Sequence, residues 1–454
     1  MQVTAKELFG WGNLCHGMCH AVSPISEAEL CEALAMDSQP SWLARGLGRS
    51  YGDAAINSGS GVILPDRLEG ICHFDALSKL LTARGGTSLA AVIERVLPQG
   101  YYLPVTPGTC QVSIGGAIAA DVHGKNHHCD GSFINFVRAF TLLTASGDRL
   151  GCSREQNADV FWATAGGMGL TGVIVDAQLE LTPVETAYVC AEMTRVGDLD
   201  KMLDCLESRD RRQRYSIAWV DCHARGKHTG RGVLITGHGA RVSDLPPHLQ
   251  ADPLRLPNRR RFSVPRGVVP KRLLNRHSIR LLNSLYYHRG ASRQTVMSFD
   301  KFFHPLDFAD HWNRLYGRWG FAQFQAVLPE ESSRRGLLAI LECVSRSRLA
   351  SFVAGIKTAG AASDGLLSFM RPGHTIAIDL LNRPCLTDTL EQLNQITTDL
   401  GGRVYLAKDS SLRPEQFAVM YPRLEEFRRI KRRLDPANRF ASSLSRRLAI
   451  VEAS

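Results

Sequence analysis

The stretch from residue 104 to residue 131, PVTPGTCQVSIGGAIAADVHGKNHHCDG, constrains the fold of this 454-residue chain most strongly. Gly108, Gly115 and Gly116 let the backbone pass close to a flat ligand, because glycine has no Cβ atom. The stretch ends with three histidines around Lys125 and Asn126, a run too polar for a core. Three such histidines also suit a metal ion, but no carboxylate or cysteine pattern completes the site, and we expect none. The stretch therefore indicates a binding site for a planar ligand and an anionic substrate.

Two further glycine-rich segments accompany it, GLGRSYGD at residues 46–53 and GGMGLTG at residues 166–172. The first follows a predicted strand at residues 42–45, but its G-x-G-x-x-x-G spacing is one residue longer than the nicotinamide-dinucleotide fingerprint, and a loop and strand follow it rather than a helix. These features exclude a standard nicotinamide site. Successive N–H groups in such a turn can still hold a pyrophosphate, whereas a purely structural β-turn is the alternative.

Length and composition favour a globular protein of two domains, with 44% hydrophobic residues. The first twenty residues show no basic head followed by an apolar run, so we expect no signal peptide, and no stretch is apolar enough to span a membrane. Twelve irregularly spaced cysteines are typical of reduced thiols in a cytoplasmic protein. The run CHGMCH at residues 15–20 would place metal ligands on one helical face, but no second pair completes a zinc site.

Basic residues concentrate in a segment at residues 254–290 that contains no Asp or Glu and accounts for the net charge of +10. A solvated loop is one interpretation, and a surface that rests on anionic lipid is another. Nucleic-acid binding is a third, although no helix-turn-helix, zinc-finger or RNA-platform motif lies beside it. The ten basic residues are Arg255, Arg259, Arg260, Arg261, Arg266, Lys271, Arg272, Arg276, Arg280 and Arg289.

Several local patterns predict secondary structure. We expect a helix capped by Ser26, a second helix capped by Thr87, and a hairpin that turns at residues 146–148. From residue 191 to residue 400, strand and helix patterns alternate, which favours an antiparallel sheet with helices on one side, forming a roof over the ligand.

On an ordered set of motifs the chain resembles the vanillyl-alcohol-oxidase superfamily of flavoproteins, and within it the oxidases of polyprenyl-phosphate ribose. The motifs are GLGRSYGD, PGTCQVSIGGAIAADVHGKNHH, LLTASGD, FWATAGGMGLTGVI, FHPLD, YLAKDS and KRRLDPANRFASSLSRRL. The resemblance implies an α+β fold with a PCMH-type, two-subdomain FAD-binding domain at residues 1–190, completed by residues 400–454. A substrate-binding domain, an antiparallel sheet with helices, would be inserted at residues 191–399.

The resemblance also implies a set of FAD contacts. Members with covalent flavin carry a histidine where this chain has Arg49, and a guanidinium cannot form that bond, so we expect non-covalent FAD with Arg49 favouring the pyrophosphate. The implied contacts are Arg45, Gly46, Leu47, Gly48, Arg49, Ser50, Tyr51, Gly52, Asp53, Gly108, Ser113, Ile114, Gly115, Gly116, Ala120, Asp121, Val122, His123, Ile174 and Tyr405.

Two catalytic residues are expected from the resemblance and from their chemistry. Lys408 would stabilise the negative charge that develops on the flavin when a hydride arrives, although a surface ion pair with Asp409 is the alternative. His123 would accept the hydroxyl proton or would pack beside the flavin as a neutral hydrogen-bonding partner.

Substrate contacts are implied at Tyr51, Lys125, Trp219, Gln325 and Lys357. On pattern alone, a tryptophan such as Trp219 in an apolar strand is more often a core residue, and Gln325 is equally well explained as a solvent-facing strand residue.

The chain also departs from the family pattern. Ala377 stands where mycobacterial members have a pocket cysteine, so thiol-directed covalent inhibition should fail, and His374 and Phe303 alter the expected pocket wall.

The function that the resemblance implies is FAD-dependent oxidation of the 2′-hydroxyl of polyprenyl-phospho-β-D-ribose to a keto sugar, which a separate short-chain reductase would then reduce on the way to an arabinose donor for cell-envelope glycans. The enzyme would be cytoplasmic and peripheral at the anionic inner face of the membrane. A soluble aldonolactone or alditol oxidase and, from another class, a basic nucleic-acid-binding protein are the alternatives.

Overall fold

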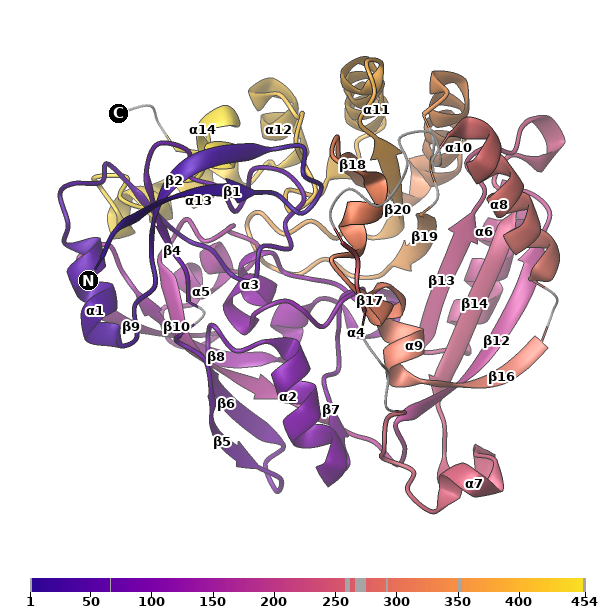
Figure 1. The fold of residues 1–454 in the computed structure, drawn as a ribbon, viewed down its shortest axis with the longest axis horizontal. Coiled ribbons are helices and arrows are strands. Elements are labelled where there is room, and N and C mark those ends of the chain that lie inside the picture. The colour runs from indigo at the N-terminus through magenta and orange to yellow at the C-terminus, as the bar shows by residue number, and fades with distance from the viewer. Residues whose placement is uncertain are drawn as a thin grey trace.

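The computed structural model describes residues 2–65, 67–257, 262–265, 275–290, 293–349, 351 and 353–451. Figure 1 shows the C-terminal helices next to the first two strands, and a large sheet built from the middle of the chain on the opposite side. The α+β fold class expected from the sequence is confirmed.

A four-stranded sheet in the order β1-β2-β4-β3 begins the part of the chain that we predict to be the first domain. Its strands are β1 (Thr4–Phe9), β2 (His16–Val22), β4 (Gly61–Ile63) and β3 (Trp42–Ala44). Ser26 caps helix α1 (Glu27–Leu34) by accepting from the Glu29 N–H, as predicted. The CHGMCH run enters strand β2 rather than a helix, so its histidines and cysteines do not share a helical face. No group of metal-ligating side chains suited to an ion occurs in the described residues.

A five-stranded sheet in the order β5-β6-β10-β8-β9 forms the second part of this domain. Strands β8 and β9 make the predicted hairpin, and Gly147 in its turn has φ of +86°, which glycine adopts without strain. The second predicted helix begins one residue later than expected, because Ser88 caps it while the Thr87 hydroxyl bonds the backbone of Gly70. The elements are β5 (Ile71–Asp75), β6 (Leu80–Arg84), α2 (Leu89–Val96), α3 (Ile114–Ala119), β8 (Val137–Leu143), β9 (Arg149–Ser153), α5 (Ala158–Thr164) and β10 (Val173–Glu180).

The middle of the chain forms an eight-stranded sheet in which the paired neighbours are antiparallel, as predicted. Three helices, α6 (Leu199–Asp210), α10 (Glu330–Ser347) and α11 (Leu386–Asp399), pack against one face of this sheet. In sheet order the strands are β16 (Arg293–Ser298), β12 (Tyr188–Val196), β14 (Gly232–Gly239), β13 (Tyr215–Val220), β19 (Ala354–Ala359), β20 (Gly373–Leu381), β18 (Phe321–Pro329) and β21 (Arg403–Val404).

The remaining elements are short. They are β7 (Tyr101–Tyr102) paired with β11 (Thr182–Pro183), β15 (Phe262–Ser263) paired with β17 (Ala309–Asp310), α4 (His127–Asp130), α7 (Pro247–Gln250), α8 (Arg276–Arg289), α9 (Phe299–Phe303), α12 (Pro414–Met420), α13 (Leu424–Leu434) and α14 (Ser443–Arg447). Single turns of 3-10 helix are η1 (Leu97–Gln99), η2 (Phe133–Phe136), η3 (Gly226–His228), η4 (Val242–Asp244), η5 (Pro305–Phe308) and η6 (Trp312–Tyr316).

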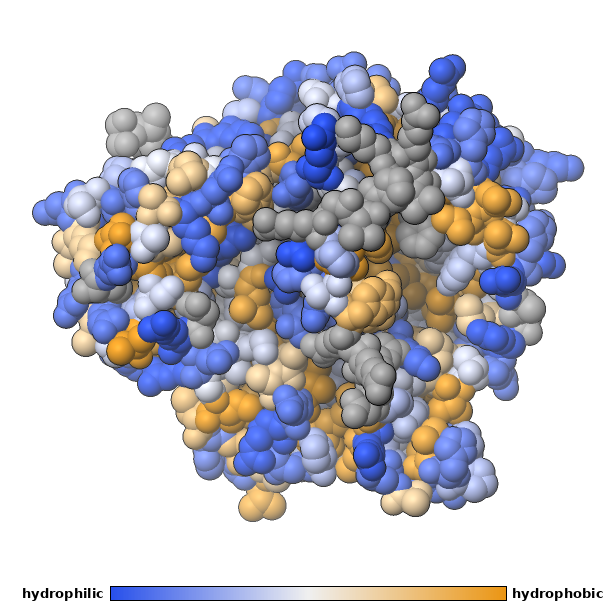
Figure 2. All heavy atoms as spheres, viewed as in Figure 1, coloured by the Kyte–Doolittle hydropathy of each residue, from blue (hydrophilic) through white to orange (hydrophobic). Residues whose placement is uncertain are grey.

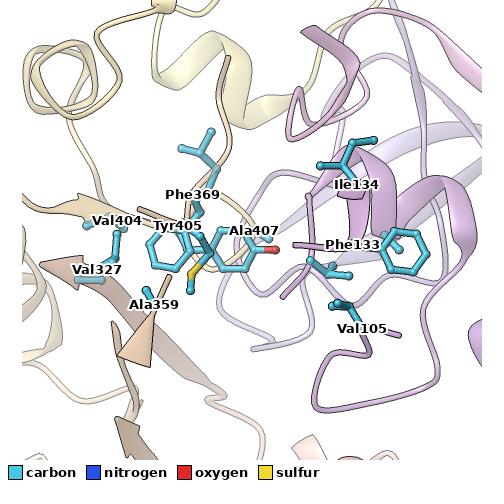
Figure 3. Packing of buried hydrophobic residues seen from close by; sticks show 14 of the residues in the cluster. Val105, Phe133, Ile134, Val327, Ala359, Phe369, Val404, Tyr405 and Ala407 are labelled. Carbon is cyan, nitrogen blue, oxygen red and sulfur yellow. The ribbon is translucent and has the colours of Figure 1, made fainter. Parts of the chain in front are cut away.

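One hydrophobic core runs from the first domain into the large sheet. The rings of Phe369 and Tyr405 stack with their centroids 4.6 Å apart, and Figure 3 shows them near Ala407, with Phe133 and Ile134 of the first domain on the other side. Continuous close packing of this kind fixes the relative position of the two parts. The walls of the site described below therefore come from one rigid core.

The described residues contain neither a disulfide nor a helix suited to span a membrane. All twelve cysteines are among them, and none forms a disulfide. In the described part of the chain no helix is long and apolar enough to cross a membrane.

Candidate active site

A cavity of about 1040 Å³ lies between the glycine-rich segments of the first domain and the open face of the eight-stranded sheet. One side of its lining comes from the loop after strand β3 and from the segment that leads into helix α3, and the other side comes from strands β12, β13, β14, β18, β19 and β20. Residues more than 350 positions apart therefore share one cavity, which joins two of the three glycine-rich motifs, at residues 46–53 and 104–131, to the later YLAKDS turn. No residue of the third motif, GGMGLTG at residues 166–172, lines it.

The GLGRSYGD loop presents unpaired backbone donors to this cavity. Gly46, Leu47, Gly48, Arg49 and Ser50 all line it, and their N–H groups donate to no group in the described residues. Gly48 has φ of +65°, so the chain turns tightly there. Consecutive N–H groups in a tight turn form a concave anion site. The loop is therefore suited to the pyrophosphate of a dinucleotide.

Two glycines of the site have different surroundings: Gly46 is closely packed, and Gly108 is not. A Cβ on Gly46 would lie 2.4 Å from the Ser113 hydroxyl oxygen, which itself caps helix α3. At Gly108 a Cβ would meet nothing within 4 Å, so its backbone faces open space in the cavity wall. The two segments thus form a smooth bed for a flat ring system, and the donors and the bed together fit FAD.

Most of the expected cofactor contacts border the cavity. Arg49 lines it with its guanidinium over the Trp11 ring, 4.2 Å from the centroid, and bonded to the Leu47 carbonyl oxygen. The expected residues found in the wall are Gly46, Leu47, Gly48, Arg49, Ser50, Tyr51, Gly108, Ser113, Gly116, Ala120, Val122, His123 and Tyr405.

The other expected contacts stand behind the wall, and their neighbours explain why. Arg45 donates to the carbonyl oxygens of Phe9 and Ala55, which fixes the start of the loop. Ile114 is fully buried in the core. Seven predicted contacts do not line the cavity, and their contact with FAD stays a prediction: Arg45, Gly52, Asp53, Ile114, Gly115, Asp121 and Ile174.

Two carboxylates in that set hold neighbouring segments together. Asp53 accepts two hydrogen bonds from Arg447, at 2.9 and 2.7 Å, and Arg447 also donates to Asp409 at 2.9 Å. Asp121 accepts from the hydroxyls of Ser363 and Ser368, each at 2.7 Å. Neither carboxylate is turned toward the cavity, and both tie later segments to the glycine-rich bed.

His123 lies at the centre of the site and is held from both sides. Its Nδ1 atom is 2.9 Å from the ammonium nitrogen of Lys357, and its Nε2 atom is 3.0 Å from the amide nitrogen of Gln325. Burial, and then the charge of Lys357, hold the pKa of His123 well below its usual value. The imidazole is therefore neutral at physiological pH.

Three lysines from three parts of the chain line the same cavity. Burial lowers the pKa of Lys125, of Lys357 and of Lys408 to about 7 in each case. Lys125 donates to the Phe302 carbonyl oxygen, Lys357 donates to the Gly124 carbonyl oxygen at 3.1 Å, and none of the three forms an ion pair with a described carboxylate. Buried cations without counter-charges are costly, so the arrangement favours an anionic ligand.

Lys408 is positioned by aromatic and carboxylate neighbours. Its ammonium nitrogen lies 3.7 Å from the centroid of the Tyr51 ring, a cation–π contact. The surface ion pair with Asp409 is excluded as an explanation, because Lys408 lines the cavity and Asp409 pairs with Arg447. The charge of the Asp379 carboxylate acts against burial and raises the pKa of Lys408.

Asp379 was not predicted from the sequence. It is fully buried on strand β20, accepts from Tyr316 at 2.9 Å and from the amide of Gln323, and burial raises its pKa to about 6. A sequence signal for this residue was present in the HTIAIDLL strand. A carboxylate in an otherwise apolar strand is expected to be buried and therefore requires hydrogen-bond donors.

The remaining expectations concern the pocket wall. Trp219, Gln325, Ala377 and Phe303 all line the cavity, so Trp219 and Gln325 are neither core nor solvent-facing residues. His374 does not line it, because strand β20 alternates and His374 faces the helix side with Ile376 and Ile378. The expectation that His374 alters the pocket wall was wrong.

Comparisons with known proteins agree with this geometry. The FAD binding domain family matches residues 20–153, and the D-arabinono-1,4-lactone oxidase family matches residues 381–448. These two matches cover the glycine-rich bed and the turn that carries Lys408.

Full-length relatives extend the match to the whole chain. Decaprenylphosphoryl-β-D-ribose oxidase of Mycolicibacterium smegmatis is 37% identical, over 99% of this chain and 98% of its own length. An uncharacterized protein of Streptomyces coelicolor is 36% identical over 80% of this chain and 100% of its own length. L-gulonolactone oxidase of Bos taurus is 30% identical over only 44% of this chain and 45% of its own length. The chain thus belongs to the decaprenylphosphoryl-β-D-ribose oxidase family of FAD-dependent oxidoreductases.

Proposed function

We propose that this protein oxidises the 2′-hydroxyl of a polyprenyl-phospho-β-D-ribose to the 2′-keto sugar. The observation that supports it best is that Lys125, Lys357 and Lys408 line the same cavity as His123. A phosphodiester beside Lys125 or Lys408 compensates the charge of that ammonium group and raises its pKa, so substrate binding and protonation of that lysine assist each other. A neutral sugar provides no such compensation.

FAD, when bound, would accept the hydride that leaves the sugar carbon. We propose that it is bound non-covalently, since Arg49 occupies the position of the linking histidine in the flavin-bed motif. The N–H groups of residues 46–50 would hold the pyrophosphate, and Gly108 and Gly116 would lie under the ring system. Lys408 would face the side of the ring on which negative charge develops, where a fixed ammonium stabilises it.

His123 and Lys357 provide a route for the hydroxyl proton. As the distances stand, Gln325 approaches Nε2 of His123 with its amide nitrogen, and Nδ1 faces Lys357. We propose that Nε2 accepts the hydroxyl proton while the Nδ1 proton passes to the neutral amine of Lys357. The ring ends neutral and the lysine ends as an ammonium, so the proton count balances. Because its pKa is well below the usual value, His123 passes the proton on rather than keeping it.

A peripheral position at an anionic membrane follows from the lipid substrate and from the charge pattern. Helix α8 carries Arg276, Arg280 and Arg289, and its leucines Leu281 and Leu285 are 61% and 46% exposed. Helices with cationic and apolar exposed side chains bind the interface of anionic bilayers. Arg259, Arg260, Arg261, Arg266, Lys271 and Arg272 of the basic segment lie outside the described residues. We further propose that a separate short-chain reductase consumes the keto product.

Anaerobic titration of the holoenzyme tests the function. Farnesyl-phospho-ribose should bleach the flavin absorbance stoichiometrically, and free ribose or an aldonolactone at the same concentration should not. Equal bleaching by free sugar or lactone would instead support a soluble sugar oxidase. That alternative has weaker support, because the L-gulonolactone oxidases match less than half of the chain.

A further inference from the structure

The open face of the eight-stranded sheet is divided into a polar and an apolar half. Its positions that line the cavity on strands β18, β19 and β20 include Gln323, Gln325 and Lys357, and Gln323 donates to the buried Asp379. On strands β12, β13 and β14 the positions that line the cavity include Met193, Ile217, Trp219 and Ile235, whose side chains are apolar. The chemistry described above uses only the polar half.

Strand register makes the apolar half continuous. Met193 on β12 lies directly opposite Ile235 on β14, and Ile235 lies opposite Ile217 on β13. All three side chains line the cavity and are partly exposed to it. Their adjacency on three neighbouring strands gives an apolar strip that crosses the sheet away from the lysines.

A second row of paired residues connects the strip to the reaction centre. Gln325 lies opposite Ala377, Ala377 lies opposite Gly355, and Gly355 lies opposite Trp219. All four line the same cavity. The two middle positions are small, so the row leaves a passage from His123 and Gln325 toward Trp219 and Ile217.

Helix α8 lies at the far end of this passage. The ring of Tyr286 contacts that of Trp219, with centroids 4.6 Å apart. On the outer side of the helix, Leu281, Leu282 and Leu285 are exposed, and Figure 2 shows an apolar patch where Figure 1 places α8. The apolar lining of the cavity thus ends beside an apolar surface.

We propose that the strip formed by Met193, Ile217 and Ile235, with Trp219 at its inner end, binds the isoprenoid chain of the substrate and leads it toward helix α8. This inference rests on the proposed function, since it assigns the tail of the same lipid whose phosphate the lysines hold. A single ligand with an anionic head and an apolar tail matches both halves of one continuous cavity. A neutral or fully polar substrate leaves the apolar half unused.

The test compares two synthetic substrates that differ only in the tail, farnesyl-phospho-ribose and methyl-phospho-ribose. The wild-type holoenzyme should prefer the farnesyl ester in kcat/KM by at least tenfold. Ile235→Gln, which keeps the side-chain size but adds a polar amide, should reduce this preference at least fivefold. Ile25→Gln is the matched control, because Ile25 is 58% exposed and outside the cavity wall.

A second variant on the neighbouring strand, Met193→Gln, provides an independent test in case Ile235→Gln does not fold. FAD absorbance and the thermal unfolding midpoint verify the fold of each. A preference that is equal in wild type and both variants, or no preference in wild type, overturns the inference but leaves the proposed function standing. If neither ester bleaches the flavin, the proposed function fails and the inference falls with it.

Discussion

The ammonium nitrogen of Lys357 lies 2.9 Å from Nδ1 of His123, and this pair joins strand β19 to the segment after helix α3. Burial and the charge of Lys357 hold the pKa of His123 low, so the histidine alone would not keep the hydroxyl proton. Burial lowers the pKa of Lys357 to about 7, which suits an acceptor that must be neutral before turnover and charged after it.

Lys357→Met should therefore reduce the rate of flavin reduction by about 100-fold, the size of a lost acid–base group. In the wild type, the rate should rise with pH through about 7, because only the neutral amine accepts the proton and its lowered pKa is about 7. The variant should lack this rising limb. Single-turnover kinetics across the pH range measure it, with exposed Lys227→Met as control. If the rate of flavin reduction in Lys357→Met still rises with pH through about 7, the rise belongs to another titrating group.

Asp379→Asn should change how stability depends on pH. Burial raises the pKa of Asp379 from 3.8 to about 6, so the folded protein binds this proton more tightly than the unfolded chain. The stability that this provides is fully present below pH 3.8 and is lost as pH rises through about 6. A shift of this size corresponds to roughly 3 kcal/mol.

Urea unfolding at the two ends of that pH window measures the effect. Relative to wild type, Asp379→Asn should gain stability as pH rises across the window, whereas exposed Asp37→Asn should not. Parallel curves for wild type and Asp379→Asn would contradict the assigned pKa shift.

Arg447→Met should destabilise the protein and loosen FAD. It leaves Asp53 and Asp409 without their shared cation, and removal of one partner from a buried charge cluster costs about 3–5 kcal/mol. The two carboxylates flank the GLGRSYGD loop and Lys408, so the dissociation constant of FAD should rise as well. Chemical unfolding and flavin fluorescence measure these changes. Adding Asp409→Asn should recover part of the loss, and strictly additive effects would show that the cluster does not act as a unit.

The flavin should be released on denaturation. With Arg49 in place of a linking histidine, precipitation of the holoenzyme with acid should leave the yellow chromophore in the supernatant. Chromophore that stays with the precipitated protein would contradict non-covalent binding.

Local signals predicted much of the site. The glycines of residues 46–52 and 108–116, and the hairpin turn at Gly147, depend on backbone conformation that a few neighbouring residues encode. The Asp379 network was missed because Tyr316, Gln323 and Lys408 reach the carboxylate only through tertiary packing and strand pairing.

Strand register explains other differences from the sequence predictions. His374 and Ala377 are three residues apart, so they face opposite sides of strand β20, and a motif alignment does not encode which side is covered by helices. Thr87 and Ser88 are both good caps, and only the partner at Gly70 decides between them.

The position of hydride removal tests the central proposal most directly. Farnesyl-phospho-ribose carrying deuterium at C2 of the sugar should reduce the flavin several-fold more slowly than the unlabelled ester in anaerobic single-turnover kinetics, while deuterium at C3 should leave the rate unchanged. Slowing by the C3 label alone, or equal rates for all three substrates combined with no 2′-keto product, would contradict oxidation at the 2′-hydroxyl.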